Sequence, residues 1–316
     1  GTKFIYERTG AGLFNCAFRS TKDLSQKGGY IYAWMMDALM LGIGVGFDTL
    51  GAKTLTVKEP QRTNEAFKIS DSREGWVDSV HVLLDGYLQG KKVPQFDYSL
   101  IRGPGELIKG FGGTSSGAGP LIELHKNLSE LLDERIGEPI GSVDIVDVEN
   151  LIGRCVVAGN VRRSAALAIG QPDDSTYLTM KNDQDKLYHH RWGSNNSFEA
   201  KVGMDYTWHA KQSQVNGEPG YIWLDNARYY GRMKDGKKYN DTKVMGFNPC
   251  VEQQLEDAEL CCLVETFPAK HETFEDYIKT LEIAYMYGKT VTLVNTHWPE
   301  TNAIMLKNRR IGLSQS

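Results

Sequence analysis

The chain has 316 residues, 41% of them hydrophobic and 24% charged, and carries a formal net charge of −4. These values are typical of a globular protein and exclude the global basic field with which proteins hold DNA or RNA. No apolar run approaches the ~20 residues of a membrane span, and the first residues lack the charged-then-apolar pattern of a secretion signal.

The five cysteines do not form the dense disulfide framework of a small secreted domain, because the chain is long and their number is odd. No Cys-x-x-Cys pair indicates a zinc site. We therefore expect a cytoplasmic protein without a metal site, a nucleic-acid partner or a membrane partner, in which the cysteines serve reactivity.

The first predicted elements are a helix over residues 30–41 and a strand over residues 42–48. Apolar residues recur at helical spacing in the first segment, and Gly42, Gly44 and Gly46 open the second. A dinucleotide-binding fingerprint has a strand, then glycines, then a helix, which is a different order. The glycines therefore indicate a strand that packs closely against another segment or lets a ligand pass.

Helices and short strands continue to alternate along the chain. We expect helices over 71–92, where a capping box starts the helix, and over 121–132, 142–158 and 273–288. We expect strands over 94–100, 165–170, 194–198 and 290–294, and His189 and His190 on the surface. This alternation predicts a parallel α/β architecture, and because no linker divides the chain we expect a single domain over residues 1–316. The final residues stop within an apparently structured segment, so we expect more chain beyond them.

Two loops carry groups that suit an anion. Residues 109–117 form a glycine-serine loop before a predicted helix, and Arg162 with Arg163 follows another. Backbone N–H groups, hydroxyls and guanidinium groups at such positions can bind a phosphate. A flexible connector and a solvated corner explain these loops equally well, so both interpretations stay open.

The richest chemistry lies in Asn248-Pro249-Cys250-Val251-Glu252, which Cys261 follows. A single cysteine is usually a small buried hydrophobe. Here, however, residues two apart in an extended segment point the same way, so Asn248, Cys250 and Glu252 can face one substrate. The group combines a one-electron or nucleophilic sulfur, a proton acceptor and an amide that can hold the carboxylate or a substrate hydroxyl.

This segment resembles the finger loop of ribonucleotide reductases, together with residues 255–261 and 263–268. Similar segments from the same family are residues 13–18, 159–165 and 194–197. Residues 287–293, 296–302 and 308–312 are similar to the monomeric, adenosylcobalamin-dependent (class II) ribonucleoside-triphosphate reductases. The likeness runs from about residue 13 to residue 316, and the order of the motifs is preserved.

The resemblance implies a ten-stranded α/β barrel with the finger loop threaded through its middle, and adenosylcobalamin as the generator of the radical. It implies that Cys250 becomes a thiyl radical and takes the 3′ hydrogen of the ribose. Glu252 would deprotonate the 3′ hydroxyl, and Asn248 would bind that carboxylate or the sugar.

The resemblance also implies that Cys16 and Cys261 supply the electrons by closing a disulfide. Neighbouring residues on a strand face opposite ways, so only one of Cys261 and Cys262 should reach Cys16, and we choose Cys261. Cys155 lies in an apolar helical stretch and is expected in the core.

The implied ligands are a ribonucleoside triphosphate as substrate, a deoxynucleotide as effector and a thioredoxin-like reductant, acting on a monomer. The residues that match nucleotide-proximal motifs are Asn15, Gly113, Ser115, Arg162, Arg163 and Asn196. The effector loop with the two arginines, the glycine-serine loop and Asn196 can each equally be structural. A phosphate-binding loop and a further cysteine pair are expected beyond Ser316.

Two other functions remain open. The chain could belong to a class I catalytic subunit, which takes its radical from a metal-bearing partner protein. It could also be a nucleotide-binding barrel that performs no reduction, although the cysteines and Glu252 at these offsets argue against an idle site.

Overall fold

The computed structural model describes residues 2–108, 113–158, 164–231 and 236–316. Its strands are β1 Cys16–Arg19, β2 Gly44–Asp48, β3 Gln61–Lys68, β4 Lys92–Asp97, β5 Ala166–Gly170, β6 Ser194–Glu199, β7 Gly220–Ile222, β8 Gly246–Phe247, β9 Gln254–Leu255, β10 Glu259–Thr266 and β11 Ile311–Gln315. Its α-helices are α1 Thr2–Glu7, α2 Leu24–Lys27, α3 Tyr30–Met40, α4 Arg73–Gln89, α5 Gly119–Asp133, α6 Ser142–Ala158, α7 Ser175–Thr179, α8 Gln184–His189, α9 Thr207–Asn216, α10 Leu224–Tyr230, α11 Phe274–Val291 and α12 Pro299–Asn308.

A seven-stranded sheet in the order β11-β10-β1-β2-β5-β6-β7 forms the centre of the molecule. The five strands from β1 to β7 in this order run parallel to their neighbours, and β10 and β11 are parallel to each other. The two groups meet at β1 and β10, which are antiparallel. The α/β class is therefore confirmed, with seven strands of the expected ten-stranded barrel in the central sheet of the described residues.

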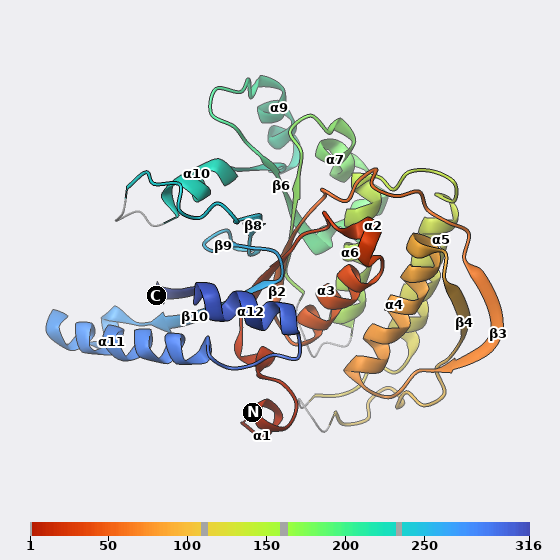
Figure 1. Ribbon diagram of the computed structural model, residues 1–316, viewed down its shortest axis with the longest axis horizontal. Helices are drawn as coiled ribbons and strands as arrows, with labels where there is room; N and C mark the ends of the chain where they lie inside the picture. The colour runs from red at the N-terminus through yellow and green to blue at the C-terminus, as the bar shows by residue number, and fades with distance from the viewer. Residues whose placement is uncertain (1, 109–112, 159–163, 232–235) are drawn as a thin grey trace.

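Helices cover one face of this sheet in two layers. Helix α3 contacts β1 and β2, α6 contacts β5, and α4 and α5 pack on α3 and α6. The parallel pair β3-β4 lies beyond them and contacts α4 (Figure 1). Helix α3 is buried along most of its length because its apolar residues surround it on all sides, which is typical of a helix between two layers.

The start of α4 corrects one detail of the sequence analysis. The Ser72 hydroxyl accepts a hydrogen bond from the N–H of Gly75, as an N-cap residue should. The capping box needs Glu or Gln at the position that Gly75 occupies, so only half of the expected box forms. Helix α4 ends with Gly90 in the left-handed conformation, at φ 71°.

Two expectations near the surface are wrong. The predicted strand over 290–294 is absent from the described residues, because α11 continues to Val291 and buries Tyr277, Ala284 and Gly288 at helical spacing. His190 is buried, and its Nε2 lies 2.9 Å from Asp147 Oδ1, so a charged partner holds it inside the fold.

The opposite face of the sheet carries the antiparallel hairpin β8-β9, which contacts β1 and β2. A smaller core lies on this face and includes Cys16, Phe18, Leu167, Ile222 and Cys261. Among the residues described, none of the helices combines the length and apolar composition needed to span a lipid bilayer.

Candidate active site

The hairpin presents its tip, residues 248–253, against the first residues of β1 and β2. Met245 N–H donates to the Leu255 carbonyl at 2.9 Å, and Asn248 N–H donates to the Gln253 carbonyl at 3.1 Å. Val251 occupies the left-handed region at φ 66°, which is rare for a β-branched residue. Strain of this kind persists where surrounding contacts fix the backbone, and it often marks functional loops.

Glycines in β2 make room for the hairpin. A Cβ atom on Gly46 would lie 1.7 Å from the Phe247 carbonyl oxygen, and one on Gly44 would lie 3.1 Å from Pro249 Cγ. Only glycine allows the hairpin backbone to approach the strand this closely. The close packing expected of the glycine pattern is therefore confirmed, and the packed segment is the one that carries Cys250.

Asn248 connects three groups of the site. Its Nδ2 donates to Glu252 Oε1 at 2.6 Å and to Cys16 Sγ at 3.1 Å, while its Oδ1 accepts from Gln253 N–H at 3.0 Å. The side chain is completely buried. Because all these bonds are made at once, Asn248 fixes the direction of the Glu252 carboxylate relative to Cys16.

Cys16 and Cys261 lie directly opposite each other in the antiparallel pair β1-β10. Both belong to the core on the hairpin side of the sheet, whereas Cys262 belongs to the core on the helix side. Directly opposed residues of antiparallel strands have Cα atoms about 4.5–5.5 Å apart, a separation that a disulfide can bridge. The geometry thus brings Cys261, and not Cys262, to Cys16, while all five cysteines are free thiols.

The two opposed thiols differ in acidity. The hydrogen bond from Cys261 lowers the pKa of Cys16, the Asn248 amide adds to this effect, and burial opposes it. The same hydrogen bond, together with burial, raises the pKa of Cys261. Cys16 is therefore the readier thiolate and Cys261 the readier proton donor, a useful division of roles for a dithiol that reduces a substrate.

Cys250 differs from both because it is exposed at the hairpin tip. Partial burial raises its pKa, and the charge of Glu252 raises the pKa further. Nucleophilic cysteines need a lowered pKa, since the thiolate is the reactive form. A neutral thiol beside a carboxylate suits transfer of a hydrogen atom better than nucleophilic attack.

The other sequence-predicted residues lie in different places. Asn15 precedes Cys16 and accepts the N–H of Leu263 at 3.0 Å, which extends the pairing of β1 with β10. Gly113 and Ser115 bond to the backbone of residues 105–108 in their own loop. Arg162 and Arg163 lie outside the described residues.

Asn196 is not brought to the hairpin. Asn196 is buried on β6, two residues before Phe198, so both side chains point to the same face of the sheet. Phe198 belongs to the core on the helix side, so this is the face away from the hairpin. Asn195 is exposed, points to the opposite face from Asn196, and is the register partner of Leu167. Because Leu167 belongs to the core on the hairpin side, Asn195 faces the hairpin side of the sheet. The motif drew attention to the right strand, but the two-residue period of a strand turns Asn196 away from the hairpin.

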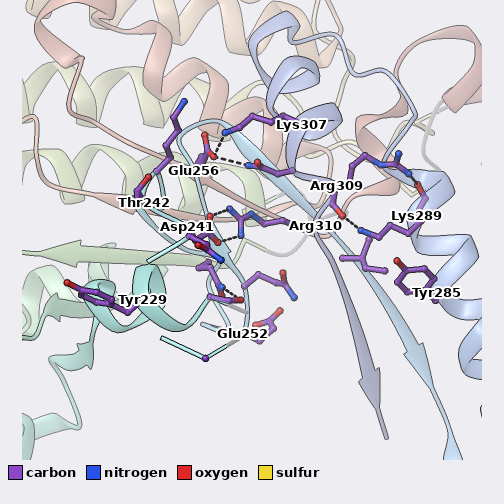
Figure 2. Close-up of a pocket in the computed structure, with 18 residues that line it drawn as sticks. Tyr229, Asp241, Thr242, Glu252, Glu256, Tyr285, Lys289, Lys307, Arg309 and Arg310 are labelled. Carbon is purple, nitrogen blue, oxygen red and sulfur yellow. Dashed lines mark hydrogen bonds and ion pairs between the residues drawn. The ribbon is translucent and has the colours of Figure 1, made fainter. Parts of the chain in front are cut away.

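A pocket of about 950 Å³ lies along the Glu252–Gln254 side of the hairpin (Figure 2). Its lining is rich in amide, hydroxyl and cationic side chains, including Asn240, Thr242, Lys243 and Lys307. No group of three or more histidine, cysteine or acidic side chains suited to a metal ion occurs in the part of the chain that the structure describes. Sequence reasoning missed this pocket because its walls come from distant segments.

Together, the fold and the hairpin define an α/β-barrel type of protein in which a thiol-bearing loop packs on one face of the central sheet. Residues 48–132 match the model of the insertion domain of B12-dependent ribonucleotide reductase. This stretch contains α4, β3, β4 and most of α5, the outer layers over α3 and α6.

Whole-chain comparisons agree. The chain is 49% identical to a probable adenosylcobalamin-dependent ribonucleoside-triphosphate reductase of Dictyostelium discoideum, across 97% of this chain and 43% of the relative. It is 50% identical to the adenosylcobalamin-dependent ribonucleoside-triphosphate reductase of Euglena gracilis, across 97% of this chain and 42% of the relative. A crystal structure of a B12-dependent (class II) ribonucleotide reductase matches with a TM-score of 0.83 and 32% identity, over 96% of this chain and 50% of that one.

The chain belongs to the adenosylcobalamin-dependent (class II) ribonucleotide reductase family. It spans about half the length of the relatives that it matches, between 42% and 50% of the two reductases named and the solved structure.

Proposed function

We propose that this chain forms the part of a ribonucleotide reductase that carries the catalytic cysteines, and that the enzyme converts ribonucleoside triphosphates to 2′-deoxyribonucleoside triphosphates. One observation carries the proposal: the hairpin brings the exposed thiol of Cys250 and the Glu252 carboxylate, which Asn248 binds, to the opposed thiols Cys16 and Cys261. The names of the relatives support the triphosphate substrate and the cofactor.

In the proposed reaction, the radical form of Cys250 takes the 3′ hydrogen atom of the ribose. Glu252, which Asn248 orients, accepts the proton of the 3′ hydroxyl as a general base. Cys16 and Cys261 then supply two electrons and two protons: their sulfur–sulfur bond forms, the C2′–O bond breaks, and the 2′ oxygen leaves as water. One hydrogen from this dithiol replaces the hydroxyl at C2′, and the other leaves in the water. Cys250 finally returns the hydrogen atom to C3′, and Glu252 returns its proton to the 3′ oxygen.

The described residues fit adenosylcobalamin in two respects. The Cys250 thiol is exposed, so a bulky group can approach it, and the polar pocket lies beside Glu252. Asn240, Thr242 and Gln254 would hold the amide side chains of the cofactor in this pocket. When bound, the cofactor supplies a carbon-centred radical by homolysis of its cobalt–carbon bond.

Other assignments extend the same proposal. Asn15 keeps Cys261 in register with Cys16, and Asn195 takes the substrate-facing position first expected for Asn196. Gly113, Ser115, Arg162 and Arg163 serve nucleotide recognition. The protein acts as a cytoplasmic monomer with a deoxynucleotide effector and a thioredoxin-like reductant.

The test is reduction of ribonucleoside triphosphates by the full-length protein with a dithiol, with and without adenosylcobalamin. The proposal expects deoxynucleotide only when the cofactor is present. Product that appears only after a metal-bearing partner subunit is added would favour class I. Nucleotide binding without product under either condition would favour a barrel that performs no reduction.

A further inference from the structure

Arg310 joins the two ends of the segment that carries the hairpin. Its Nε donates to the two carboxylate oxygens of Glu259 at 3.0 and 3.1 Å, and its Nη1 and Nη2 donate to Asp241 at 2.5 and 2.7 Å. Asp241 precedes β8, and Glu259 begins β10 after the hairpin has returned. One guanidinium, on the residue just before β11, therefore holds both legs of the hairpin. Figure 2 shows its bonds to Asp241 on the outgoing leg.

The C-terminal end of α12 makes a second attachment to the returning leg. Asn308 Nδ2 donates to Glu256 Oε1 and to Glu259 Oε1, each at 3.0 Å. Lys307 Nζ lies 2.8 Å from Glu256 Oε1. We call Asp241, Glu256, Glu259, Asn308 and Arg310 the clamp.

The chemistry of the clamp favours fixed geometry over net stability. Glu259 is completely buried and the Arg310 side chain is 14% exposed, so both groups lose most of their hydration. Desolvation of a buried ion pair offsets much of its attraction, which makes its net contribution to stability small. A planar guanidinium that binds two carboxylates at once does, however, fix their relative positions, and the single ammonium group of lysine cannot do so.

We propose that Arg310 is a positioning residue for the reaction: it sets where the Cys250 thiol and the Glu252 carboxylate lie relative to Cys16 and Cys261. This inference rests on the proposed function. Through the clamp, any movement at Arg310 is passed to both legs and so to the tip of the hairpin. Misplacement by about 1 Å can cost a reaction roughly 100-fold in rate.

Arg191 provides a matched control on the other side of the sheet. It donates to the two carboxylate oxygens of Asp147 at 2.7 Å each and is 4% exposed. Asp147 lies on α6 in the helix layer. Arg191→Lys therefore removes a comparable buried pair of hydrogen bonds between a guanidinium and a carboxylate, and leaves the clamp intact.

The experiment compares Arg310→Lys with Arg191→Lys in the full-length protein. Three quantities are measured: the melting temperature, kcat and KM for ribonucleoside-triphosphate reduction, and hydrogen exchange of the amides of Asn248, Val251 and Gln253. We expect both variants to melt at a lower temperature. Only Arg310→Lys should lower kcat at least tenfold, with KM changed less than twofold, and speed exchange of the hairpin amides at least tenfold.

A purely stabilising role would make the two variants alike in kcat and in hairpin exchange, and this result would overturn the inference. If Arg310→Lys does not fold, Asp241→Asn serves instead, because it loosens one leg and leaves the bond to Glu259. Hydrogen exchange needs no turnover, so it separates the two proposals. If the wild type makes no deoxynucleotide and Arg310→Lys still speeds hydrogen exchange of the hairpin amides, the clamp is supported and the proposed function is refuted.

Discussion

Glu252 is the residue whose assigned role depends most on the hydrogen bond that it receives. Asn248 donates to its Oε1 at 2.6 Å, and the Glu252 side chain itself is exposed. A glutamine at this position can still accept that hydrogen bond but cannot take a proton. The role of base and the role of structural partner can therefore be separated by one substitution.

We expect Glu252→Gln to lower kcat by roughly 100- to 10,000-fold, the usual contribution of a general base. The melting temperature should change little, because the bond to Asn248 is kept. Steady-state reduction assays and thermal unfolding measure the two effects. Near-normal turnover in this variant would show that Glu252 does not act as the base.

The opposed thiols allow a prediction that needs no turnover. Mild oxidation with diamide should form a disulfide between Cys16 and Cys261 in the wild type and in Cys262→Ser, because only Cys261 lies opposite Cys16. Cys261→Ser should give no such link. Peptide mass spectrometry identifies the bond, and a link between Cys16 and Cys262 would contradict the proposed pairing.

At the scale of elements, the hairpin depends on the shape of β2. A Cβ on Gly46 would lie 1.7 Å from the Phe247 carbonyl, so Gly46→Ala must push the hairpin away from the sheet. We expect it to lower the free energy of unfolding by about 1–3 kcal/mol, the usual cost of overpacking, and to lower turnover as well.

The control for this change is Gly119→Ala at the start of α5, where an added Cβ meets no atom within 4 Å. Alanine favours a helix more than glycine does, so stability should stay the same or rise slightly. Chemical denaturation measures both variants. Equal stability of the two would mean that the hairpin tolerates displacement.

The packing between α4 and α5 predicts a dependence of stability on pH. Burial lowers the pKa of His125 to about 3, and its ring bonds Ser79 at 3.1 Å and Tyr98 at 2.7 Å. In the unfolded chain the imidazole pKa returns to about 6.5. Between these values the unfolded state binds a proton that the folded state does not, so stability falls as the pH falls.

We expect this histidine to remove about 2 kcal/mol of unfolding free energy between pH 6.5 and pH 5, at ~1.4 kcal/mol per pH unit for one proton. His125→Gln should start from a lower stability and show a flatter dependence on pH. Denaturant unfolding at the two pH values measures the difference. The same slope in the variant and the wild type would refute the assignment.

Across the described residues, the sequence predicted the five longest helices, α3 to α6 and α11, because their spacing of apolar residues is strong, but it predicted no helix at α9 or α12. It predicted no strand at β3, since this strand is largely exposed and shows no alternation. It also predicted a strand over 290–294, where α11 continues to Val291 because apolar contacts to β10 and β11 extend the helix.

The candidate site was predictable only where chemistry is local. Cys250, Glu252 and Asn248 lie within five positions of one another, and the resemblance added Cys16 and Cys261. The pairing of Cys16 with Cys261, the orientation of Asn196 and the attachment of Arg310 to Asp241 depend on sheet register and on contacts between distant segments. No pattern within a short window carries that information.

The central claim is that an adenosylcobalamin-dependent radical at Cys250 drives nucleotide reduction. The most direct measurement is the yield of deoxynucleotide from the full-length wild type and Cys250→Ala, each with a dithiol and with or without adenosylcobalamin. Cys250 is exposed, so its replacement should leave the fold intact. We predict product only from the wild type with the cofactor. Product from Cys250→Ala, or from the wild type without the cofactor, would contradict the claim.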